Sequence, residues 1–271
     1  MKIEKVTIEP ATAKTWLKRH NTRNRFLSKT RAERLAQAQR NGEWQFNGQP
    51  IQFAFDGTLL DGQHRLLACV LSDIAMESLV IWGVDSESQH TMDMGKPRSV
   101  ADILALEGYS NHFALAALAK RIALYKAKGL RYALHQSNVQ TPGEILREAR
   151  ELTNPQRYLG EAKAVARVLR LNPTVVGLFM WITDQIDQED SEFFWGRLRS
   201  GVDLSEGQPV YALRVWATDP SRDTMTNNSQ SRTTHGGIIA KAWNKFRTGE
   251  TVTRLNFKTG GAKPEQFPEL V

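Results

Sequence analysis

The stretch that decides the fold of the N-terminal part reads Leu59-Leu60-Asp61-Gly62-Gln63-His64-Arg65-Leu66. The two leucines end a predicted strand, and a predicted helix begins directly after the glycine. A helix N-terminus presents backbone N–H groups and the positive end of the helix dipole, which together favour an anion. Gly62 lets the backbone approach a ligand closely, and the Arg65 guanidinium can bind phosphate through two hydrogen bonds. The stretch therefore predicts a phosphate site. The alternative is a strand–helix turn capped by Asp61, with Arg65 in solvent.

The residues on either side predict a small unit of strands and helices. Ile51, Phe53 and Phe55 alternate with Gln52 and Ala54, a pattern typical of a strand with one buried face. Asp56-Gly57 is a hairpin signal, because both central residues of that turn need positive φ. Further strands are predicted at residues 5–8 and 78–84, and helices at 12–20, at 28–41 and around 66–71. Thr12 is the expected cap of the first helix, and either Ser28 or Thr30 that of the second.

After Gly108 the apolar residues recur at helical spacing almost throughout. Thr141-Pro142-x-Glu144 is a helix start signal, because proline suits the first helical turn. Strands mixed with helices, followed by helices alone, indicate an α+β fold. We predict a small mixed-sheet domain at residues 1–108 and a mainly α-helical domain at residues 109–271.

Two further loops carry cations that could face the site predicted at Gly62. Asn21-x-Arg23-Asn24-Arg25 precedes the second predicted helix. The loop Met92 to Ser99 contains a glycine with Lys96 and Arg98, and also Asp93. Each loop alone is typical of a solvated surface, but three cationic loops in one small unit indicate a shared anionic ligand.

The charge of the chain is unevenly placed. The formal net charge is +7, and residues 1–50 carry all of this excess, with eleven basic and four acidic side chains. Residues 227–271 hold seven basic and three acidic side chains. Two basic ends suggest an anionic partner, either a nucleotide or a nucleic acid. The cations on the predicted N-terminal helices are candidates for a nucleic-acid face, or simply for solvent: Lys14, Lys18, Arg19, Arg31, Arg34 and Arg40.

Composition excludes several other classes of protein. With 41% hydrophobic and 24% charged residues the chain is typical globular material. The single cysteine, Cys69, lies among apolar residues and is predicted to be buried in a reducing compartment. Neither a His-x-x-x-His nor a Cys-x-x-Cys spacing occurs, so a structural zinc site is not expected. Without a signal-peptide core or a long apolar run, we expect an intracellular, cytoplasmic protein that does not span a membrane.

The order of these motifs resembles the N-terminal domain of the ParB/sulfiredoxin superfamily over about residues 1–108. Residues 21–25 are similar to the phosphate-binding box of ParB proteins, and Gly62, His64 and Arg65 match the loop that contacts nucleotide phosphates there. The C-terminal half is similar to phage-encoded ParB-like proteins, which implies the cytoplasm of a phage host as a setting. Gln63 stands where sulfiredoxins carry their reactive cysteine, so repair of oxidised cysteine is not expected.

The resemblance implies a sulfiredoxin-like fold that binds a nucleoside triphosphate, ATP or CTP, with Mg²⁺. Our hypothesis is NTP-dependent phosphoryl transfer or NTP hydrolysis in connection with nucleic acid, with modification of phage DNA as one setting. Asp61 and Asp93 are the candidate metal ligands, and Asp61, His64 and Glu33 are the candidate catalytic groups, although Glu33 better suits a solvated helix face. The candidate nucleotide-binding residues are Arg23, Asn24, Arg25, Gly62, Gln63, His64 and Arg65.

Two other functions remain open at the level of the sequence. One is a non-enzymatic DNA-binding adaptor, in which the basic segments contact phosphates directly. The other is a small-molecule kinase, as found among superfamily members that act on free amino acids. The sequence does not determine the nucleotide, the acceptor or the oligomeric state.

Overall fold

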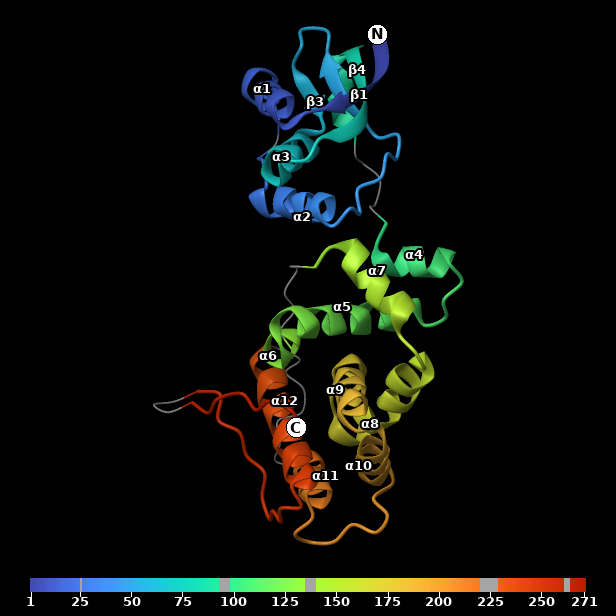
Figure 1. The fold of residues 1–271 in the computed structure, drawn as a ribbon, viewed down its shortest axis with the longest axis vertical. Helices are drawn as coiled ribbons and strands as arrows, with labels where there is room; N and C mark the ends of the chain where they lie inside the picture. Colours follow the sequence, from blue (N-terminus) through green and yellow to red (C-terminus); the bar gives the residue numbers. More distant parts are fainter. Residues whose placement is uncertain (25, 93–97, 135–139, 220–228, 261–263) are drawn as a thin grey trace. The chain divides into compact units, whose positions relative to one another are not determined.

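The computed structural model describes residues 1–24, 26–92, 98–134, 140–219, 229–260 and 264–271 (Figure 1). The chain divides into two compact units, Met1–Pro97 and Arg98–Val271. The first contains a four-stranded mixed sheet and the second consists mostly of helices, which confirms the predicted α+β class. The division falls before α4 (Val100–Leu106), because this helix packs against α5 (His112–Lys128) and α7 (Pro142–Glu151) of the second unit.

The sheet of the first unit has the strand order β1-β4-β2-β3. β1 (Lys2–Ile8) pairs antiparallel with β4 (Met76–Val84), and β4 pairs in parallel with β2 (Pro50–Ala54). β2 and β3 (Leu59–Asp61) form the antiparallel hairpin that Asp56-Gly57 predicts. β3 is therefore an edge strand, and the segment that leads into Gly62 lies at the border of the sheet.

The buried face of β2 differs from the prediction at one residue. Ile51 and Phe53 are fully buried, but Phe55 is 78% exposed and Ala54 is buried instead. The register between β2 and β4 shifts between Phe53 and Ala54. The additional residue of this shift, Gly83, lies in β4. β2 itself ends at Ala54, and Phe55 lies in the turn that follows, outside the alternation of the strand. The prediction that Phe55 belongs to the buried face is therefore wrong.

Three helices accompany the sheet: α1 (Pro10–His20), α2 (Lys29–Arg40) and α3 (Gln63–Ser72). α1 begins with proline in its first turn, so Thr12, the expected cap, lies inside the helix. The cap of α2 is Ser28, one of the two predicted candidates, and its Oγ accepts a hydrogen bond from the Arg31 N–H at 3.3 Å. The core that these elements enclose includes Ile8, Ala13, Ile51, Phe53, Leu59, Leu66, Cys69, Met76 and Val80.

The second unit is built around α9 (Pro173–Ile186), most of whose residues are buried. The helix start predicted at Thr141-Pro142-x-Glu144 is the start of α7, where Thr141 and Glu144 also form a capping box. Among the described residues no single helix is long and apolar enough to cross a membrane; one bent pair, 157–169 with 173–186, meets that test jointly. The other elements are α6 (Leu130–Leu134), the π-helical turn η2 (Arg157–Glu161), α8 (Ala162–Leu169), α10 (Gln188–Ser200), α11 (Pro209–Thr218) and α12 (Ser229–Arg247).

Candidate functional site

The predicted junction between strand, glycine and helix forms at Gly62. Its φ of 105° lies in the left-handed region that favours glycine. A Cβ built on Gly62 would lie 2.3 Å from Cδ1 of Ile51, which is fully buried. The glycine therefore allows the start of α3 to pack directly on β2. Gln63 and His64, the first two residues of α3, are also buried.

Amide side chains from the loop at residues 21–24 connect this helix start to the edge strand β3. The Nδ2 atom of Asn21 donates to Oε1 of Gln63 at 3.3 Å. The Nδ2 atom of Asn24 donates to Oδ1 of Asn21 at 2.7 Å and to the carbonyl oxygen of Leu59 at 2.6 Å. The structure thus brings together three of the sequence motif residues, Asn21, Asn24 and Gln63. Their bonds to β3 also satisfy backbone groups at the edge of the sheet.

Gln89 belongs to the same amide cluster, although no sequence motif pointed to it. It lies in the 3₁₀ helix η1 (Ser86–Thr91), and its Nε2 atom donates to Oδ1 of Asn24 and to the carbonyl oxygen of Leu60, both at 3.1 Å. A single glutamine 65 residues from Asn24 has no motif or periodicity that could reveal this contact. Gln89 fixes the orientation of Asn24, and Asn24 in turn holds Asn21.

His64 joins the N-termini of two helices. Its Nε2 atom accepts a hydrogen bond from the backbone N–H of Ser28 at 3.1 Å, so the proton of the neutral ring lies on Nδ1. Ser28 is the N-cap of α2 and His64 lies in the first turn of α3. Neither helix, both of them fully described, has an acidic residue in its first turn. Two positive dipole ends therefore meet at this contact.

Arg65 and Asp61 bond to each other beside this junction. The Nη2 atom of Arg65 lies 2.9 Å from Oδ2 of Asp61 and 2.7 Å from the carbonyl oxygen of Pro50. Its Nη1 atom donates to the carbonyl oxygen of Gln49 at 2.7 Å. The two side chains are 14% and 26% exposed. Arg65 thus ties the start of β2 to α3, and Asp61 is neutralised by the cation that follows it.

The structure does not bring Arg23 to the guanidinium of Arg65. Arg23 is exposed, and its positive charge acts on Asp56 in the β2–β3 turn. Hydrogen bonds from Thr58, and to a smaller extent the charge of Arg23, lower the pKa of Asp56. Arg65 instead bonds to the carbonyl oxygens of Gln49 and Pro50 and to the carboxylate of Asp61.

The remaining predicted site residues lie apart from this junction or outside the described residues. Glu33 is exposed on α2. Arg25, Asp93 and Lys96 fall outside the described ranges. Among the described residues there is no group of three or more His, Cys, Asp or Glu side chains that could hold a metal ion.

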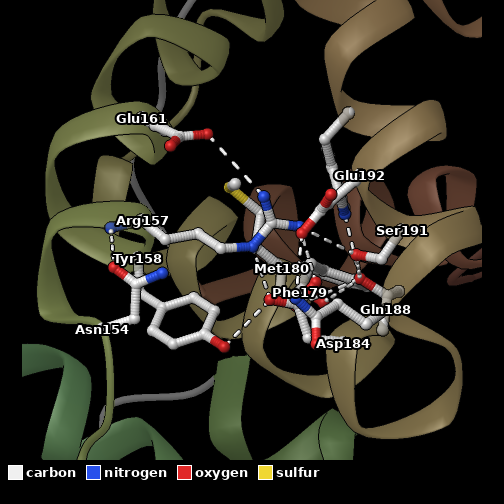
Figure 2. A network of polar contacts seen from close by, with 12 residues as sticks. Asn154, Arg157, Tyr158, Glu161, Phe179, Met180, Asp184, Gln188, Ser191 and Glu192 are labelled. Carbon is white, nitrogen blue, oxygen red and sulfur yellow. Dashed lines mark hydrogen bonds and ion pairs between the residues drawn. The ribbon is translucent and has the colours of Figure 1, made fainter.

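The helical unit contains a second polar centre, which the sequence did not reveal (Figure 2). Nε of Arg157 donates to Oδ2 of Asp184 at 2.5 Å, and Nη2 donates to Oδ1 at 2.6 Å. The hydroxyl of Tyr158 donates to the same carboxylate at 2.9 Å, and burial, followed by this hydrogen bond, raises the pKa of Tyr158. Arg157 and Tyr158 begin the π-helical turn η2. Turns of this kind are frequent at functional sites.

Three further side chains extend this centre into the helix pair α9 and α10. The hydroxyls of Thr183 and Ser191 lie 2.7 Å apart, and Nε1 of Trp195 donates to Oγ1 of Thr183 at 2.9 Å. Thr183 and Ser191 are fully buried. The network links η2, α9 and α10 through buried hydrogen bonds, which make the positions of these side chains well defined.

No protein-family model matches this chain, and no curated protein or solved structure shows significant similarity to it.

Proposed function

We propose that the N-terminal unit binds the phosphate groups of a nucleoside triphosphate where α2 and α3 meet, and that the protein carries out NTP-dependent phosphoryl transfer or NTP hydrolysis in connection with nucleic acid. The observation that carries this proposal is the hydrogen bond between Ser28 and His64, which places two helix N-termini side by side. Each such end stabilises a nearby anion by about 0.3–1 kcal/mol. Two of them with no acidic residue in either first turn favour an anion more strongly than one.

The loop that leads into α2 supports the same ligand. Asn21 and Asn24 are held in place by hydrogen bonds to Gln63, to Leu59 and to Gln89. A loop fixed in this way loses little entropy when it binds a ligand. The resemblance of residues 21–25 and 61–65 to the phosphate-binding segments of the ParB/sulfiredoxin superfamily supports ATP or CTP as the nucleotide.

When a nucleotide binds with Mg²⁺, the ion pair of Asp61 and Arg65 would open and each side chain would take a new ionic partner. Phosphoryl transfer requires mainly positioning and neutralisation of charge. Mg²⁺ in nucleotide sites commonly takes one or two carboxylates together with the phosphates, so Asp61 would hold it and the ion would neutralise phosphate charge. Arg65, released from Asp61, would then pair with a phosphate. Each side chain exchanges one ionic partner for another, which keeps the cost of opening the pair low.

Calorimetric titration of the intact protein with ATP, CTP, GTP and ADP in the presence of Mg²⁺ tests this proposal. We expect binding of at least one triphosphate, and at least tenfold weaker binding by Arg23→Ala, because the exposed Arg23 belongs to the loop before α2. Arg19→Ala is the matched control, since Arg19 is an exposed cation of α1 outside that loop. Absence of binding by the intact protein, or equal losses in both variants, would contradict the proposed site.

A non-enzymatic DNA-binding adaptor is the second candidate, and one observation favours it. Six basic residues on α1 and α2 are exposed and take part in none of the ion pairs between described residues: Lys14, Lys18, Arg19, Lys29, Arg31 and Arg34. Arg40 differs, because its Nη2 donates to the carbonyl oxygen of Leu71. DNA affinity that falls steeply with salt, and that neither nucleotide nor Arg23→Ala changes, would select this function.

A further inference from the structure

A hollow of about 320 Å³ opens beside the pair of Arg157 and Asp184 in the helical unit. Its floor is formed by the buried side chains of Arg157, Val165, Met180 and Trp195. Its rim carries exposed charged residues from η2 and α10. A volume of this size lies at the small end of the range of about 300–1,000 Å³ that is typical of sites for small molecules.

The floor of the hollow contains a hydrogen-bond donor without an acceptor. Nε and Nη2 of Arg157 bond to Asp184, whereas Nη1 lies 3.7 Å from Oε2 of Glu161 and donates no hydrogen bond within the described part of the chain (Figure 2). A separation of 3.7 Å is too long for a hydrogen bond. Arg157 is only 8% exposed, but its Nη1 atom is not one of the fully buried atoms that lack a partner, so this atom is open to the hollow. Nη1 therefore suits an acceptor atom that a ligand would bring into the hollow.

Gly196 indicates that this space is kept open. It lies in the middle of α10, where glycine costs about 1 kcal/mol relative to alanine. Such a glycine usually makes room for a close neighbour, but a Cβ built on Gly196 would meet no heavy atom within 4 Å. Gly196 lines the hollow. The missing side chain thus leaves room for an occupant against the backbone of α10.

The charges around the hollow define the class of ligand. Arg157 and Arg199 are balanced by Glu161 and Glu192, and Asp184 lies behind Arg157. A phosphate or nucleotide would meet the two glutamates, and a simple cation would meet the guanidinium on the floor. Because positive and negative side chains both line the hollow, a ligand that carries one positive and one negative charge matches it best.

We propose that this hollow binds a small zwitterion of the α-amino-acid class with an apolar side chain. The carboxylate accepts a hydrogen bond from Nη1 of Arg157, and the ammonium group faces Glu161 and Glu192. The apolar side chain packs against Val165 and Met180. This site lies wholly within the helical unit and does not depend on nucleotide binding by the N-terminal unit.

Titration calorimetry of the full chain with L-leucine and L-methionine tests the proposal. Two analogues of leucine each lack one charge: leucinamide lacks the carboxylate and N-acetyl-leucine lacks the ammonium group. We expect each analogue to bind at least tenfold more weakly than leucine. Glu161→Gln should weaken leucine binding at least tenfold, and Glu189→Gln, an exposed residue of α10 that does not line the hollow, should leave it unchanged.

Gly196→Leu separates loss of the ligand site from loss of the fold. The new side chain has room at its Cβ and leucine favours a helix over glycine, so thermal stability should be kept while leucine binding falls at least tenfold. Leucine binding that survives Gly196→Leu would overturn the proposal, as would equal binding of the two analogues. Failure of the intact protein to bind either amino acid would also overturn it, whatever its nucleotide affinity.

Discussion

The Nε2 atom of His64 accepts a hydrogen bond from the backbone N–H of Ser28, and this contact fastens the start of α3 to the start of α2. Because His64 is only 8% exposed, no water easily replaces it as the acceptor. The contact has a structural role whether or not a phosphate binds beside it. Stability measurements on the apo protein can therefore isolate this role.

His64→Ala should lower the free energy of unfolding of the N-terminal unit by about 1–3 kcal/mol, because it leaves the N–H of Ser28 unsatisfied. Urea denaturation followed by circular dichroism measures the loss. His112→Ala, which removes a partly exposed histidine from the first turn of α5, is the control and should cost less. Equal effects of the two substitutions would show that the hydrogen bond contributes little.

Gly62→Ala should destabilise the protein for two separable reasons. The positive φ costs a non-glycine residue about 1–2 kcal/mol, and the contact of 2.3 Å between the new Cβ and Ile51 adds about 1–3 kcal/mol of overpacking. Gly48→Ala carries only the first cost, because its φ is 76° and nothing lies within 4 Å of its Cβ. Chemical denaturation of both variants measures the difference. If the two lose equal stability, close packing on Ile51 is not the reason for glycine at position 62.

Local signals in the sequence predicted local structure well. The cap of α2 at Ser28 and the capping box at Thr141 involve bonds over three residues, so the motif contains both partners. The hairpin predicted at Asp56-Gly57 also formed, but only Gly57 has a positive φ, because the loop spans the three residues between Ala54 and Thr58. Phe55 was misplaced because β2 ends at Ala54, one residue before the end of the apolar alternation, so that Phe55 lies in the turn.

The candidate site was harder to predict from the sequence than the fold, because its contacts connect segments that are distant in the sequence. Nothing in the pattern around Gln89 points to Asn24, and Arg157 meets Asp184 across 27 residues. Arg65 presents a different difficulty. The sequence around an arginine does not distinguish a guanidinium that binds phosphate from one that binds backbone carbonyl oxygens. Only the fold shows that Arg65 donates to the carbonyl oxygens of Gln49 and Pro50.

Arg65→Ala should lower the free energy of unfolding by about 1–3 kcal/mol even without nucleotide, because the carbonyl oxygens of Gln49 and Pro50 lose their donor. The ion pair with Asp61 is partly exposed, so it should contribute only about 1 kcal/mol or less of this. A double-mutant cycle with Asp61→Asn, measured by urea denaturation, separates the two contributions. An apo stability that Arg65→Ala leaves unchanged would mean that these carbonyl contacts are energetically neutral.

Cys69 makes stability depend on pH in the alkaline range. Burial, and then the negative charge of Glu9, raises the pKa of its thiol to about 11. Below pH 9 the thiol is protonated in both states; as the pH rises from 9 towards 11, the unfolded thiol ionises first, so stability falls. The loss should reach up to about 1.4 kcal/mol per pH unit relative to Cys69→Ala, which lacks the group. Urea titrations of both proteins at pH 8, 9 and 10 measure this loss. If stability changes with pH equally in both proteins, the pKa of Cys69 is not raised.

Asp184→Ala should be the most damaging substitution in the helical unit. It removes the partner of Arg157, which is 8% exposed, and leaves an uncompensated buried cation at a cost of about 3–5 kcal/mol. Tyr158→Phe deletes one hydrogen bond to the same carboxylate but keeps the ion pair, so it should cost only about 0.5–1.5 kcal/mol. Thermal and urea unfolding of the two variants measure the two losses in the free energy of unfolding. Similar losses would show that Arg157 gains enough water through the adjoining hollow to keep its charge without Asp184.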